Sequence, residues 1–136
     1  MDFIPAGEII GDAHQVRLVR IAQNPLLPDG EYKFIDSYCS DPNCDCRKTM
    51  IQVMHNKKLV SIINYGWETP AFYEKWLGNK EKDDPMPSMS GASIDINSPN
   101  LVDTEEMLAL FNTLLNDIWI AKFKNHYKKF KAAIAQ

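Results

Sequence analysis

The hydrophobic pattern of the sequence changes once, near Gly66, and this change limits the folds that the chain can adopt. Before it, segments 14–22, 31–39 and 48–66 carry short apolar runs with alternation, as expected for strands with one buried face. After it, apolar residues recur at three- and four-residue spacing, which is typical of amphipathic helices. Strands followed by helices predict an α+β domain, in which an antiparallel sheet of about four to five strands packs against the C-terminal helices.

Segment 48–66 has the clearest strand pattern, because a polar break at residues 55–58 separates two apolar-rich runs, as in a β-hairpin. Segment 31–39 is rich in aromatic and β-branched residues, which favours a strand, although its spacing also permits a single helical turn. One more short strand is expected at 91–96. The antiparallel sheet is therefore predicted mainly from the first half of the chain.

Capping residues predict where the helices begin. Thr69 followed by Pro70 is a typical helix start, and Asp103 or Thr104 precedes two acids that favour the positive end of a helix dipole. The predicted helices cover 69–78, a segment that begins at 103 or 104, and 118–135 after a polar break at 116–117. Two prolines and many polar residues predict an exposed loop at 79–91.

Size and charge exclude several classes of protein. With 136 residues, 45% apolar and 24% charged, the chain 1–136 is expected to form a single globular domain. Its start lacks the basic and apolar regions of a secretion signal, and no stretch approaches the roughly 20 apolar residues that span a bilayer. We therefore expect no membrane association and a cytoplasmic location, where thiols stay reduced. A net charge of −3 disfavours a dedicated nucleic-acid binder.

All three cysteines lie within YCSDPNCDCR, residues 38–47. Cys39 ends one predicted strand, while Cys44 and Cys46 precede the next and, two residues apart, can point to the same side. A turn at 41–43 would fold Cys39 back toward them, so that three thiolates and one further ligand could complete a tetrahedral zinc site. The alternatives are an unmetallated reactive thiol cluster and ordinary buried cysteines, although the polar neighbours disfavour the latter. An iron–sulfur centre ranks behind zinc because it usually takes four cysteines.

The fourth ligand must come from a histidine or a carboxylate. His55 lies nine residues past the last cysteine along a predicted strand, which at about 3.3 Å per residue places it near the opposite end of the sheet. His14 begins the first predicted strand, so its position is compatible with either end of the sheet. His126 borders the apolar stripe of the last predicted helix. An ordinary buried histidine is the alternative for His126, and Asp41 or Asp45 is the local alternative as ligand. The predicted ligand set is Cys39, Cys44, Cys46 and His126.

Several motifs of the sequence resemble those of a known group of proteins. They are the cysteine segment, the later INYGWE and GASIDI, and a late His-Tyr pair on a basic helix. The chain resembles a group of uncharacterised prokaryotic proteins that share a Y-C-x-D-P-x-C-D-C-R-type segment, some of which carry a SEC-C-type zinc-binding tail that this sequence does not contain. The resemblance covers residues from about 30 to the C-terminus. It implies a metal-binding module of unknown function and assigns no catalytic residue.

Enzyme signatures are missing from the sequence. It contains no P-loop, dinucleotide-binding glycine pattern, nucleophile elbow or HExxH, and it lacks the His-x-Glu and Pro-Cys-x-x-Cys of zinc deaminases. Three thiolates would also make a zinc-bound water a weak acid, which favours a structural site over a catalytic one. The predicted function is a zinc-stabilised binding or adaptor module with an unidentified protein partner. A metal or thiol redox sensor is the second hypothesis, and a metal-dependent enzyme is the third.

Lysines and aromatic residues alternate along the last predicted helix. The lysines are compatible with phosphate binding, but the spacing favours aromatic side chains in the core with solvated lysines beside them. The interleaved residues are Lys122, Phe123, Lys124, Tyr127, Lys128, Lys129, Phe130 and Lys131.

Overall fold

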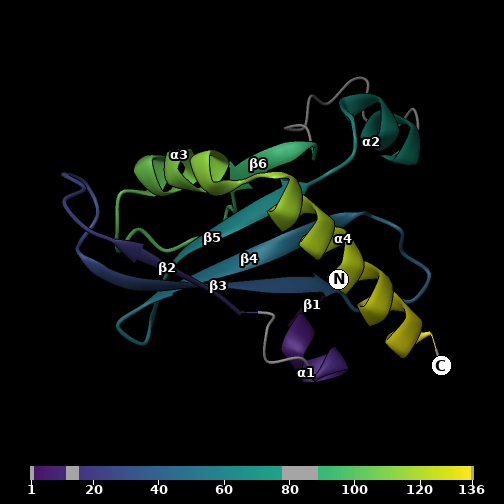
Figure 1. Ribbon diagram of the computed structural model, residues 1–136. Coiled ribbons are helices and arrows are strands. Elements are labelled where there is room, and N and C mark those ends of the chain that lie inside the picture. The colour runs from purple at the N-terminus through teal and green to yellow at the C-terminus, as the bar shows by residue number, and fades with distance from the viewer. Residues whose placement is uncertain (1, 12–15, 78–88, 136) are drawn as a thin grey trace.

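The computed structural model describes residues 2–11, 16–77 and 89–135 (Figure 1). Its frame is a six-stranded antiparallel sheet in the order β1-β3-β4-β5-β6, with β2 paired to the same edge of β3 as β1. The strands are β1 (Phe3–Pro5), β2 (Val16–Ile21), β3 (Gly30–Cys39), β4 (Lys48–His55), β5 (Lys58–Gly66) and β6 (Gly91–Ile94). The helices are α1 (Ala6–Ile10), α2 (Pro70–Leu77), α3 (Thr104–Leu114) and α4 (Asp117–Ile134). Helices α3 and α4 cross one face of the sheet, which confirms the predicted α+β fold.

The strand and hairpin predictions of the first half are confirmed. Residues Asn56 and Lys57 connect β4 to β5 with positive φ angles of 50° and 64°, the backbone conformation of a tight two-residue hairpin turn. Residues 31–39, for which a single helical turn was the alternative, lie in strand β3. This strand pairs with β4 on one edge and with β1 and β2 on the other. Strand β1 and helix α1 were not predicted.

Helix starts follow the capping signals. The Asp103 carboxylate accepts a hydrogen bond from Glu106 N at the start of α3, and the Asn116 side chain accepts one from Trp119 N at the start of α4. Thr69 caps α2 through a 3.2 Å bond from Phe72 N to its hydroxyl. Most of the loop predicted at 79–91, and also His14, lie outside the described residues.

Two apolar clusters, which share the partly buried Trp67 as a neighbour, hold helices on the sheet. The larger one, here called the main core, comprises Ile21, Leu27, Tyr32, Phe34, Ile51, Val53, Val60, Ile63, Tyr65, Met107, Phe111 and Phe123. The smaller one, here called the second core, comprises Ala6, Tyr38, Tyr127 and Phe130, with Ile4, Ile10, Trp67 and Ile134 packed against it. The second core lies where α1 and the last part of α4 meet the end of β3 (Figure 1).

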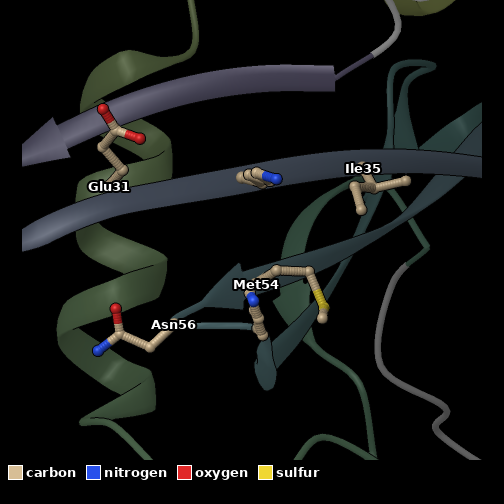
Figure 2. A pocket seen from close by; sticks show the side chains of 6 residues that line it. Glu31, Ile35, Met54 and Asn56 are labelled. Atoms are coloured by element: carbon tan, nitrogen blue, oxygen red, sulfur yellow. The ribbon is translucent and has the colours of Figure 1, made fainter.

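The opposite face of the sheet carries a shallow groove of about 450 Å³ (Figure 2). Its lining residues belong to β3, β4 and the turn that follows β4, and they are Glu31, Lys33, Ile35, Met54, Asn56 and Lys57. Successive side chains of a strand point to opposite faces, so these positions alternate with the buried residues of the main core. The groove lies toward the hairpin end of the sheet, where Tyr32 pairs with His55, and the cysteines lie at the other end.

Among the described residues, no helix combines the length and the apolar character that crossing a bilayer requires.

Candidate metal centre

The three cysteines form one cluster of sulfur atoms. The ligand atoms of Cys39, Cys44 and Cys46 all lie within 4.8 Å of one another, so the predicted grouping is confirmed. A tetrahedral zinc ion with bonds of about 2.3 Å holds its sulfurs about 3.8 Å apart, so this spacing fits the ion with small side-chain adjustments. Cys39 and Cys46 are buried, whereas Cys44 is partly exposed. The donor set therefore suits a soft, thiolate-binding metal.

Local turn chemistry brings Cys44 back to Cys39. The Asp41 carboxylate accepts a 2.9 Å bond from Asn43 N, and the Asp41 carbonyl accepts a 3.1 Å bond from Cys44 N. Asp and Asn stabilise such turns through these short side-chain to backbone bonds. At the start of the loop, Ser40 N donates to the Asp2 carbonyl at 2.9 Å. The reversal that the sequence predicted at 41–43 therefore has defined partners.

Arg47 turns the chain between the last cysteine and β4. Its φ of 47° lies in the left-handed region, which costs a residue with a side chain on the order of 1 kcal/mol or more. Its guanidinium bonds Asp45 at 3.0 Å, pairs with Glu68 at 3.5 Å and lies 4.6 Å from the centre of the Phe72 ring. These contacts offset the strain and keep the chain direction beside Cys46 defined.

The backbone of Arg47 is held as well. Its carbonyl accepts a 2.6 Å bond from the Tyr73 hydroxyl and a 3.4 Å bond from Trp67 N. Tyr73 reaches this position because residue 66 is glycine, since a Cβ there would lie 2.6 Å from the Tyr73 hydroxyl oxygen. Helix α2 and the end of β5 thus support the cysteine loop, a role that the sequence pattern did not reveal.

Helix α4 contacts the loop at both ends. The Tyr127 hydroxyl donates a 2.7 Å bond to the Asp45 carboxylate, and Lys131 Nζ donates to the carbonyls of Cys39 and Asp41, each at 2.9 Å. Sequence analysis assigned neither Tyr127 nor Lys131 to the site. Their four-residue spacing places both on one side of a helix, but the same spacing occurs in any amphipathic helix. The contacts become visible only in the folded chain.

His126 is buried, as its place beside the apolar stripe suggested, with 3% of its surface exposed. Its Nδ1 donates to Asp36 Oδ2 at 2.7 Å, and the Tyr38 hydroxyl donates to the same oxygen at 2.6 Å. A carboxylate in this position is a common partner of a metal-bound histidine, but His126 is not in the group of close ligand atoms formed by the cysteines. Its assignment as the fourth ligand stays a prediction.

The other ligand candidates have different partners. His55 stacks on Tyr32 with ring centres 4.2 Å apart, and its Nδ1 lies 3.0 Å from the Glu31 carbonyl oxygen. This is the hairpin end of the sheet, as predicted from its distance along the strand. The Asp41 carboxylate accepts from its own turn, and the Asp45 carboxylate is bound by an arginine and a tyrosine.

The electrostatics of the cluster oppose free thiolates at Cys44 and Cys46. Burial raises the pKa of Cys44 to about 12, and the neighbouring Cys46 and Cys39 add to this shift. Burial also raises the pKa of Cys46, while the Lys48 backbone N–H and the Lys131 ammonium act in the opposite direction. Without a cation, these side chains are therefore protonated at neutral pH and poor nucleophiles. A bound metal ion would replace the protons and balance the crowded negative charge.

The aromatic side chains of α4 are buried, as the spacing predicted. Phe123, Tyr127 and Phe130 face the sheet, while Lys124 and Lys128 are exposed. The lysines therefore flank a packed helix face.

Comparisons with models of known protein families, with curated proteins and with solved structures found no match to this chain.

Proposed function

We propose that this protein binds one zinc ion through Cys39, Cys44 and Cys46, and that the ion stabilises a small cytoplasmic binding or adaptor module that acts on a protein partner. The observation that carries the proposal is the approach of three sulfur atoms to within 4.8 Å on one loop. Three soft donors select zinc over hard cations such as magnesium or calcium. A reducing cytoplasm would keep the thiols available for the ion.

A structural role fits this donor set better than catalysis. Three thiolates donate so much charge to zinc that a bound water stays a weak acid, whereas catalytic zinc needs an acidic water. The surroundings support the same conclusion, because Arg47, Tyr127 and Lys131 are all engaged in holding the loop. His126 remains the proposed fourth ligand from the sequence.

Metal analysis tests the proposal directly. Protein purified under reducing conditions should contain one equivalent of zinc, and Cys44→Ser should lose most of it. Cys44 is the suitable target because it is the partly exposed member of the cluster, so the substitution disturbs packing least. Ser40→Ala, on the same loop, is the matched control and should keep the metal. Metal-free wild-type protein of undiminished stability would refute the proposal.

The second candidate is a metal or thiol sensor, which the partial exposure of Cys44 favours because this residue is the member of the cluster nearest to solvent. Chelation at neutral pH separates the two functions. An adaptor stabilised by zinc should unfold or lose much of its thermal stability in the chelator. A sensor should stay folded without the metal and should bind zinc again when the ion is added back.

A further inference from the structure

We propose that α4 belongs to the metal site although it supplies none of the three sulfurs, with Lys131 and Tyr127 acting as positioning residues that hold the loop in its metal-binding shape. This inference rests on the proposed zinc site. It extends that site from one short loop to a helix that lies more than eighty residues further along the chain.

Lys131 bridges the first half of the loop. Its ammonium donates to the carbonyls of Cys39 and Asp41, each at 2.9 Å, and lies 5.7 Å from the centre of the Tyr127 ring. The first carbonyl belongs to Cys39, itself a sulfur ligand, and the second belongs to the turn that leads to Cys44. The ammonium also brings a positive charge to a site where a divalent ion with three thiolates has a net charge of minus one. Lys131 thus both shapes the loop and favours its metal-bound charge state.

Tyr127 fixes the second half of the loop. Its hydroxyl donates to Asp45 Oδ1 at 2.7 Å and accepts a 3.4 Å bond from Arg47 N, so it holds the residues on both sides of Cys46. The ring itself packs in the second core, with its centre 6.1 Å from that of Tyr38. A side chain anchored in the core therefore sets the position of the buried Cys46.

Coupling between the helix and the loop must act in both directions. If the docked helix favours metal binding, then bound metal favours the docked helix by the same free energy. We therefore expect the last turns of α4 to exchange backbone hydrogens more slowly in the zinc-bound protein than in the chelated protein. The first turn of α4, which packs on the main core through Trp119 and Ile120, should change little.

The decisive measurement is zinc affinity, determined by competition with a chromophoric chelator. Lys131→Met keeps the length of the side chain but removes the charge and the donors, and it should weaken zinc binding about ten- to a hundred-fold. Lys131→Arg should restore most of the affinity. Lys128→Met, at an exposed position on the same helix, is the matched control and should bind like the wild type. In Co²⁺-loaded protein, the thiolate charge-transfer band should weaken or shift only in Lys131→Met.

Each outcome decides the question. Equal zinc affinity in Lys131→Met and the wild type refutes the role of α4 while leaving the zinc site intact. Loss of affinity that Lys131→Arg does not restore refutes the charge argument and leaves only a packing effect. Should Lys131→Met fail to fold, Tyr127→Phe keeps the ring and loses only the hydroxyl, and it is measured in the same way. A wild-type protein that binds no zinc refutes both proposals.

Discussion

The main core and the second core hold helices on the same sheet by different means. In the main core, aromatic rings pack on one another, with Phe111 6.4 Å from Phe34 and 6.2 Å from Trp119 between ring centres. The second core has only four buried members, and the adjoining positions are occupied by buried polar groups and cysteines. Because apolar burial contributes roughly 25 cal/mol per Å², the smaller cluster contributes much less stability.

The cysteines lie beside the smaller of the two clusters. Where little apolar surface is buried, the helix is held by directed contacts: the Asp36 and His126 pair, the Tyr127 hydroxyl and the Lys131 ammonium. A metal ion on the adjacent loop would add a further crosslink where hydrophobic packing is weakest. The comparison can be tested by disturbing each region separately.

The largest effect is expected from the main core. Phe111→Ala removes a fully buried ring and should lower the free energy of unfolding by about 3–5 kcal/mol, measured by chemical denaturation. The loss should be the same with and without a zinc chelator, because the ring lies away from the cysteine loop. Lys124→Ala, on the exposed side of α4, is the control. A loss that depends on the chelator would contradict the independence of the two cores.

A somewhat smaller effect is expected at the second core. His126→Ala leaves the buried Asp36 carboxylate without its imidazole partner and should cost about 2–4 kcal/mol in the same assay. Zinc content of this variant tests the predicted fourth ligand at the same time. Retention of one full equivalent would exclude His126 as a ligand, whereas His55→Ala should keep the metal in either case.

The smallest effect concerns pH. Hydrogen bonds from Arg47 and from Tyr127 lower the pKa of Asp45 below its usual range, against the effect of burial. A lowered pKa in the folded state means that the stabilisation is present above the unfolded-state pKa and is lost as pH falls through the folded-state value. Because the ion pair is half exposed, solvent screening limits this contribution to about 1 kcal/mol or less.

Asp45→Asn should therefore reduce the loss of stability between neutral pH and about pH 3, when unfolding is followed in metal-free protein. Glu74→Gln, an exposed acid on α2, is the control and should leave the pH profile unchanged. An unchanged profile in Asp45→Asn would show that the Asp45 contacts contribute no pH-dependent stability.

Local features of the chain could be predicted from the sequence. The hairpin turn at Asn56 and the caps at Thr69 and Asp103 depend on side chains and backbone groups within a few residues of one another, so the sequence alone can indicate them. The sulfur cluster belongs to the same class, because its three members and the turn between them lie within eight residues of sequence. Strand β1 was missed because three residues are too few to show a period.

The surroundings of the sulfur cluster were decided only by the tertiary structure. His126 bonds Asp36 across 90 residues, and Lys131 bonds the Cys39 carbonyl across 92 residues. A helical pattern predicts which side of α4 is buried, but it does not predict which residue of β3 each side chain meets, because that depends on how the helix crosses the sheet. The left-handed backbone of Arg47 has the same origin. It is tolerated because Tyr73 and Glu68, from other elements, offset its strain.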